Sequence, residues 1–379
     1  MDYKGRLHSC ESEEALIEAI DGDRNAAMAL VWSPAFPHMV LPEELRGATA
    51  AVLHSRRVLA GMDLADARDK IRWFSFLAGG LAAYLFYRAW SMAPVEAIAA
   101  RLEISIRALV SSVSIGVALL MWLVFGFIPW YQARKRVKEL DHWTAGDVAA
   151  AVPVLRFETW LEMQKAPATR FLLGLIALVG VVQLMPGNSI LAAGLMKDPE
   201  HREWWRLLTA PLMHGNLLHF MMNAAALVYL GRRIEVIAGW PHVFMVFLFS
   251  AWIGGECSLR FVELPSVGAS GGLMGWLGFL IVFESLHGRL VPIKARRRLL
   301  AGVLLTGLIG LVGFRFIDNA AHLGGLVAGL VYALIVFPKS ASAARPRPTW
   351  SDRIAGALAA MVLIFAMLIA MWKIIGAFG

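Results

Sequence analysis

The sequence predicts an all-α polytopic membrane protein, and three observations support this fold class. Hydrophobic residues make up 58% of the 379 positions, charged residues only 17%, and the mean hydropathy is +0.61. An ordinary soluble protein is much less apolar than this. Apolar stretches long enough to cross a bilayer as helices recur along the chain, and basic residues gather in alternate connections between them.

Nine apolar stretches are candidate membrane helices, because about 17–25 apolar residues cross the hydrocarbon layer as a helix. They are 73–94, 108–131, 170–189, 216–231, 241–257, 268–286, 299–314, 319–338 and 354–376. Short connections join the fifth to the eighth, as expected of a compact bundle. We therefore expect a six-helix core, with two extra transmembrane helices before it and one after it.

The remaining segments complete the predicted domain organisation. The first 70 residues are polar and lack the apolar segment of a signal peptide, so we expect the N-terminus to lie in the cytosol. The predicted parts are a small cytosolic module (1–72), two additional helices (73–131), a cytosolic connector (132–168), the core (169–338), a linker (339–353) and a final helix (354–379).

The net charge of +8 is explained by membrane topology. With the N-terminus inside, the basic clusters all fall on the cytosolic face: 134–138, 232–233, 294–298 and 339–353. This pattern gives no reason to expect a nucleic-acid partner. The two cysteines, Cys10 and Cys257, lie in different regions and belong to no metal-ligand motif, so we expect no metal site.

Polar side chains inside membrane helices are costly and usually have a function or a satisfied partner. The segment HGNLLHFMMN supplies His214, His219 and Asn223. His219 and Asn223 are four residues apart and share one helix face, whereas His214 lies off that face or in the preceding loop. The simplest interpretation of such a pair is a hydrogen bond that holds two helices together.

A serine stands among glycines at the start of another span, GASGGLMGWLG. The glycines at 268, 271, 275 and 278 make a flat stripe that lets a neighbouring helix approach closely. Ser270 lies beside the stripe, where it is either a helix N-cap or a nucleophile near free backbone N–H groups.

A third segment, NAAHLGGLVAGL, aligns His322 with Gly325 and Gly329 on one narrow helix face. If this glycine face packs on the Ser270 stripe, His322 comes within reach of the serine hydroxyl. The topology places the starts of the Ser270, His322 and His219 helices on the outer side. The polar residues then converge at one depth, which favours a functional site over simple packing.

Such a site permits nucleophilic catalysis. A serine hydroxyl needs a base within hydrogen-bond reach, and a histidine has a suitable proton affinity. Asp318 precedes His322 by four residues and is expected nearer the membrane surface, so a Ser270–His322 dyad is the more economical hypothesis. His219, Asn223 and the backbone N–H of Ser270 are candidate donors to an oxyanion.

These motifs, in this order, resemble the rhomboid intramembrane serine proteases over about residues 168–338. EWWRLLTAPLMH, with Trp205 and Arg206, precedes the segments already described. The resemblance implies a catalytic dyad of Ser270 and His322 and oxyanion stabilisation by His219 and Asn223. It further implies a bracing loop around Trp205 and Arg206, an outward-facing cavity, no cofactor, and transmembrane proteins as substrates that enter laterally and are cleaved near the outer face.

Two alternatives remain open: a catalytically silent rhomboid-like protein that binds membrane clients, and a transporter, which would show internal repeats and paired broken helices. The extra helices could dock substrate, form a dimer contact or provide anchorage, and the oligomeric state is undetermined. The basic cytosolic loops fit a bacterial inner membrane.

Overall fold

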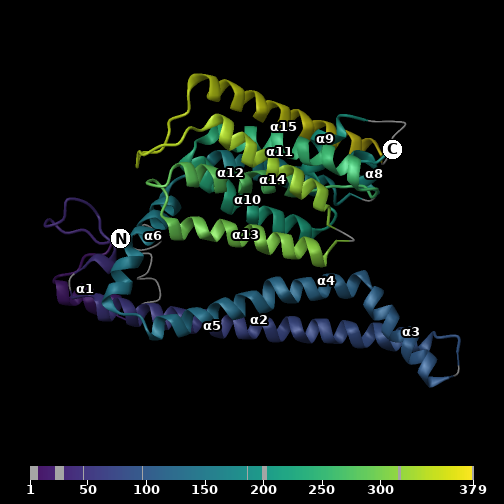
Figure 1. Ribbon diagram of the computed structural model, residues 1–379, viewed down its shortest axis with the longest axis horizontal. Helices are drawn as coiled ribbons and strands as arrows, with labels where there is room; N and C mark the ends of the chain where they lie inside the picture. Colours follow the sequence, from purple (N-terminus) through teal and green to yellow (C-terminus); the bar gives the residue numbers. More distant parts are fainter. Residues whose placement is uncertain are drawn as a thin grey trace. The chain divides into compact units, whose positions relative to one another are not determined.

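The computed structural model describes residues 7–21, 30–45, 47–95, 97–185, 187–198, 203–314 and 317–377. Regular structure within these ranges is helical, with two isolated β-bridges and no strand (Figure 1). The predicted all-α fold class is thereby confirmed. The chain forms two compact units, Met1–Arg156 and Phe157–Gly379, which are described separately.

The first unit is built around one long helix, α2 (Thr49–Ser91), which runs through position 72 without a break. Alongside it lie α4 (Val113–Met121), the π-helical segment η3 (Trp122–Phe127) and α5 (Ile128–Asp141) (Figure 1). The smaller elements are α1 (Glu13–Ile20), η2 (Pro42–Glu44) and α3 (Ile98–Ser111). A small apolar core that includes Leu45, Val52 and Val148 closes one end. The helix α6 (Ala145–Met163) spans the boundary between the units.

The second unit contains the polar motifs. Its longer helices are α7 (Pro167–Val182), α10 (Leu217–Ile237), α11 (Trp240–Phe261), α12 (Ser270–Leu286), α13 (Ile293–Val312), α14 (Asn319–Val336) and α15 (Trp350–Gly376). Short elements fill the connection from α7 to α10: α8 (Ser189–Ala193), α9 (Arg206–Thr209) and η4 (Ala210–Leu212). Each apolar stretch expected between 170 and 376 coincides with one of the longer helices.

Several described helices are long and apolar enough to cross a bilayer. They are Ser114–Asp141, Trp240–Phe261, Asn319–Val336 and Trp350–Gly376. The pair Ala145–Met163 and Pro167–Val182 passes the same test jointly, with a bend of 60° between them. Ser270–Leu286 and Leu299–Leu311 are apolar but shorter. These helices are typical of a multi-pass membrane protein.

The centre of the second unit is the packing of α11, α12 and α14, and glycines make it possible. A Cβ atom added at Gly325 would lie 2.0 Å from the carbonyl oxygen of Gly271, and one at Gly329 would lie 1.8 Å from that of Gly275. The paired numbers rise together, so α12 and α14 run parallel with their backbones in contact. The expected pairing of the two glycine faces is therefore confirmed.

The outer helices pack differently. The helix α15 lies along α7 and α11 and also contacts α8, α9 and η4, whereas α13 lies on the opposite edge of the unit and packs on α12 (Figure 1). Large apolar side chains of α13 are exposed, among them Leu304 and Leu311. Such side chains are compatible with contact to lipid.

Candidate active site

Ser270 is the first residue of α12 and is not its N-cap. The cap position belongs to Ala269, and no side chain caps this helix. Helices α10 and α14 differ, because the side chains of Asn216 and Asp318 cap them. The N-cap interpretation of Ser270 is therefore wrong, and its hydroxyl is not used by the start of its own helix.

The loop before Ser270 is shaped by a glycine. Gly268 has a φ of +131°, a backbone conformation that residues with a Cβ atom rarely adopt. A Cβ at this position would also lie 2.7 Å from Cε1 of His219 and 3.6 Å from Nδ2 of Asn223. Both side chains therefore lie against the backbone that leads into Ser270.

The side-chain amide of Asn223 is an available hydrogen-bond donor near Gly268. Its side chain is 7% exposed, and its Nδ2 has no hydrogen-bond partner among the described residues. A buried donor without a partner is costly, so an acceptor that arrives with a ligand would gain a strong hydrogen bond. An oxyanion formed at Ser270 is an acceptor of this kind.

His322 precedes Gly325 on α14 by three residues, which is nearly one helix turn. Since Gly325 faces Gly271, a rise of 1.5 Å per residue puts His322 and Ser270 within about 3 Å of the same level along the helix axes. His219 is close enough to His322 to interact with it electrostatically. The three residues predicted from separate segments therefore converge.

No hydrogen bond joins Ser270 to His322 in the described part of the chain; the backbone N–H of His322 donates to the Asp318 carbonyl oxygen at 3.1 Å. Catalytic hydrogen bonds are often long or misaligned without substrate and tighten when the substrate binds. The arrangement therefore permits a serine–base pair.

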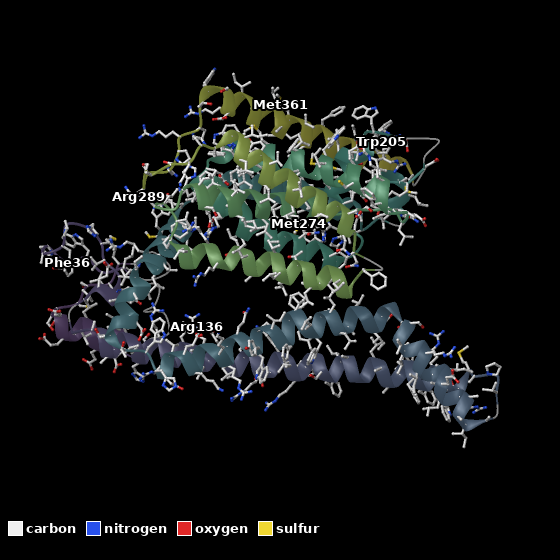
Figure 2. All side chains as sticks on the ribbon, in the orientation of Figure 1. Phe36, Arg136, Trp205, Met274, Arg289 and Met361 are labelled. Atoms are coloured by element: carbon white, nitrogen blue, oxygen red, sulfur yellow. The ribbon has the colours of Figure 1, made fainter. Side chains whose placement is uncertain are left out.

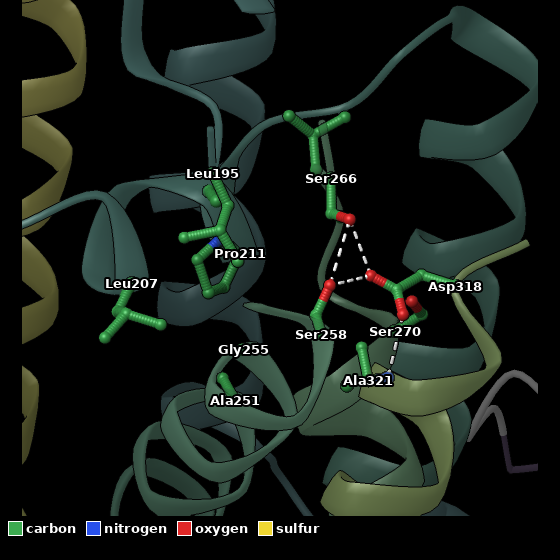
Figure 3. A pocket seen from close by; sticks show the side chains of 14 residues that line it. Leu195, Leu207, Pro211, Ala251, Gly255, Ser258, Ser266, Ser270, Asp318 and Ala321 are labelled. Atoms are coloured by element: carbon green, nitrogen blue, oxygen red, sulfur yellow. Dashed lines mark hydrogen bonds between the residues drawn. The ribbon is translucent and has the colours of Figure 1, made fainter. Parts of the chain in front are cut away.

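A cavity of about 40 Å³ opens beside Ser270 (Figure 3). Its polar lining comes from Ser258, Ser266, Ser270 and Asp318, and apolar side chains such as Leu195 complete it. Its volume is enough for one or more water molecules, which need polar partners of this kind. Water next to a reacting serine is required to hydrolyse an acylated enzyme.

His214 packs behind the site. Its ring centroid lies 5.1 Å from that of His219 in an edge-to-face arrangement. Gln183 fixes its backbone: the side-chain oxygen accepts from the His214 N–H at 2.9 Å, and the side-chain amide donates to the His214 carbonyl at 3.0 Å. The structure therefore places His214 in the loop before α10, one of the two positions expected from the sequence.

The loop around Trp205 and Arg206 is tied to the neighbouring segment. Nη1 of Arg206 donates to the carbonyl oxygens of Leu191 and Gly194 at 3.0 and 2.8 Å, and its guanidinium lies 4.5 Å from the Trp205 ring centroid. Lys373, in the last turns of α15, lies 5.0 Å from the same ring. Figure 2 labels Trp205. The bracing loop that the resemblance implies is thus anchored at several points.

Sequence reasoning missed a polar cluster at the edge of the cavity. Asp318 was expected near the membrane surface and outside the dyad, but it lines the same cavity as Ser270. Lys197 is a second member of this cluster, and burial lowers its pKa to about 8. An aspartate directly before a helix is an N-cap signal, which could have located Asp318. Nothing in the sequence pattern pointed to Lys197.

Comparison with known proteins identifies the family. A Rhomboid domain model matches residues 201–339. Rhomboid protease GlpG of Photorhabdus laumondii is 32% identical over 202 residues, which cover 51% of this chain and 70% of the relative. Rhomboid protease GluP of Bacillus subtilis is 33% identical over 150 residues, covering 38% and 27%.

RHOMBOID-like protein 6, mitochondrial, of Arabidopsis thaliana is 32% identical over 165 residues, covering 41% of this chain and 53% of the relative. The matched part thus spans about half of that plant relative and about a quarter of GluP. The match to GlpG covers more than two thirds of that relative. Together with the apolar helices, these similarities show that the chain is a multi-pass membrane protein that belongs to the rhomboid family.

Proposed function

We propose that this protein is an intramembrane serine endopeptidase that uses Ser270 as nucleophile and His322 as general base. The observation that carries the proposal is the backbone contact between α12 and α14. It holds Ser270, which does not cap its helix, at the level of His322. Membership of the rhomboid family supports the same activity.

The proposed chemistry follows from these positions. The Ser270 hydroxyl attacks the carbonyl carbon of a peptide bond while His322 accepts the hydroxyl proton, which it then donates to the leaving amine. Water then attacks the acyl-enzyme, and His322 again acts as base. No metal or cofactor takes part in this proposal.

Stabilisation of the tetrahedral oxyanion requires hydrogen-bond donors near Ser270. We assign this role to the Asn223 side-chain amide, to His219 and to the backbone N–H of Ser270. A single preorganised donor contributes about 3–4 kcal/mol to transition-state stabilisation. The Asn223 Nδ2, buried and without a partner among the described residues, meets the requirement best.

The proposed substrates are proteins with one or a few transmembrane helices. A helix holds its carbonyl groups in hydrogen bonds, so the scissile segment has to be extended before Ser270 can attack. Cleavage near the outer end of the substrate helix, in a bacterial inner membrane with the N-terminus of this protein in the cytosol, completes the proposal.

The test uses the full chain in liposomes with a single-span model substrate. Ser270→Ala and His322→Ala should each abolish cleavage while the protein remains folded. Ser285→Ala is a matched control, because this serine of α12 donates to its own helix, at the Ile281 carbonyl oxygen. Full cleavage by Ser270→Ala would refute the proposal. Folded wild-type protein that binds the substrate without cutting it would instead favour the client-binding alternative.

A further inference from the structure

Ser258, Ser266 and Asp318, from three segments, line the cavity beside Ser270 (Figure 3), and Lys197, from a fourth segment, donates to Ser258. Lys197 comes from the connection between α8 and α9, Ser258 from the last turn of α11, Ser266 from the loop before α12, and Asp318 from the start of α14. The proposed catalytic chemistry uses none of them. Ser258 and Ser266 both donate to the carboxylate of Asp318.

Asp318 uses both of its carboxylate oxygens. Oδ1 accepts from the backbone N–H of Ala321 at 2.9 Å, which caps the helix that carries His322. Oδ2 accepts from the hydroxyl of Ser266 at 2.6 Å and also from the hydroxyl of Ser258. Lys197 donates to Ser258 Oγ, so the Ser258 hydroxyl connects the Lys197 ammonium group to the Asp318 carboxylate.

The loop held by Ser266 is the one that delivers Ser270. Ser266 and Leu195 exchange two backbone hydrogen bonds of 2.9 and 3.0 Å, and Gly268 donates to the Ala210 carbonyl oxygen at 2.9 Å. One edge of this loop is therefore fixed by the connection from α8 to η4. The other edge is fixed through the Ser266 side chain to the start of α14.

We infer that Asp318 is a positioning residue, which holds the loop of Ser270 and the helix of His322 in register. This inference rests on the proposed protease function. A simple N-cap role needs one oxygen only. The second oxygen, Oδ2, accepts from Ser266 in the loop before Ser270 and from Ser258 at the end of α11, which Lys197 also contacts. It thereby connects both segments to α14, the helix that carries His322. Loss of register by even 1 Å is costly to catalysis, because reacting groups must meet in a near-attack geometry.

The experiment separates capping from positioning by substitutions at one site. Asp318→Ser keeps a good N-cap residue but removes the second oxygen, while Asp318→Ala removes both functions. Ser266→Ala removes one donor and leaves the cap intact. Thr349→Ala is the control, because Thr349 caps the distant helix α15. Each full-length variant is measured in liposomes for kcat, KM, thermal unfolding and the rate of Ser270 labelling by a fluorophosphonate.

We expect Asp318→Ser and Asp318→Ala to lower kcat and the labelling rate at least tenfold, with KM within twofold of wild type. Ser266→Ala should lower kcat severalfold, and Thr349→Ala should change neither quantity. Wild-type kcat and labelling in both Asp318→Ser and Ser266→Ala would overturn the inference and leave the protease proposal standing. Wild-type protein that neither cleaves nor labels would overturn both.

Discussion

The two flanks of α12 are built in opposite ways. Towards α11 and α14 the helix presents glycines, so that its backbone lies directly against its neighbours: a Cβ added at Gly275 would lie 2.0 Å from the Ser250 side chain and 3.1 Å from the Gly325 carbonyl oxygen. Towards α13 the contacts run through side chains, and a Cβ added at Gly302 would find Leu277 at an ordinary 3.9 Å. We call the first, close-packed flank the fixed flank, and the second, packed through side chains at ordinary distances, the adjustable flank.

This difference matches the two needs of the proposed chemistry. Two reacting side chains on separate helices need fixed helices, and close glycine packing supplies them. A transmembrane substrate has to reach the same serine from the bilayer, which requires a flank that tolerates displacement. The predictions below disturb first the fixed flank and then the adjustable one.

The largest effect is expected at the contact between α12 and α14. Gly329→Ala places a methyl group 1.8 Å from the backbone oxygen of Gly275, so the helices have to separate. Overpacking of this kind costs about 1–3 kcal/mol or more. Thermal unfolding in detergent should show a marked loss of stability, and cleavage should fall with it. Gly307→Ala in α13 meets nothing within 4 Å and should keep wild-type stability. Equal behaviour of the two variants would remove the distinction between the flanks.

The next effect concerns the donor beside Gly268. Asn223→Ala should lower kcat about 100- to 1,000-fold, because it removes one preorganised oxyanion donor. Stability should change little, since the lost Nδ2 has no partner among the described residues. Steady-state kinetics and an unfolding curve on the same sample provide the check. Near-normal kcat would show that Asn223 serves packing alone.

A smaller effect is expected from the charge of Lys197, which contacts Asp318 through Ser258. The pKa of Lys197 is lowered to about 8 by burial, while Asp318 acts to raise it. The lysine is therefore charged at neutral pH and loses its proton as the pH rises through 8. We expect kcat to fall severalfold between pH 7 and pH 9 in the wild type. At pH 7 the kcat of Lys197→Met should already be lower than that of the wild type, and it should fall less between pH 7 and pH 9. If kcat falls equally with pH in both proteins, Lys197 is not the cause.

The smallest effect is expected on the adjustable flank. Leu304 of α13 is 75% exposed, so Leu304→Ala should change the free energy of unfolding by less than about 0.5 kcal/mol. Leu280, on α12, is fully buried, and Leu280→Ala should cost about 2–5 kcal/mol. Unfolding curves for the pair measure the contrast directly. A large loss in Leu304→Ala would mean that α13 is held as firmly as α14.

The sequence predicted the parts of this structure that depend on periodicity. The glycines at 271, 275, 325 and 329 share helix faces by spacing alone, and spacing was enough to pair α12 with α14. Apolar length predicted each longer helix of the second unit, but α7 ends seven residues before the expected 189, α10 ends six residues after the expected 231, and α13 differs at its start. That helix begins at Ile293, before the expected 299, because the basic residues there are good helix formers.

The sequence could not predict features that depend on loops. Whether Ser270 or Ala269 caps α12 depends on the turn at Gly268, and no periodic pattern describes that turn. The cluster around Asp318 is assembled by the loop of Ser266 and the connection of Lys197, which come together only through tertiary contacts. The continuous helix α2 crosses position 72 because its polar first half and apolar second half are equally compatible with helix.

The central claim is that Ser270 is activated by His322, and one labelling measurement tests it most directly. Folded wild-type protein in liposomes is treated with a fluorophosphonate, and the modified residue is mapped by peptide mass spectrometry. The account predicts a single adduct on Ser270 that is absent in His322→Ala, while Ser285→Ala labels like the wild type. An adduct on another serine, or undiminished labelling of Ser270 in His322→Ala, would contradict it.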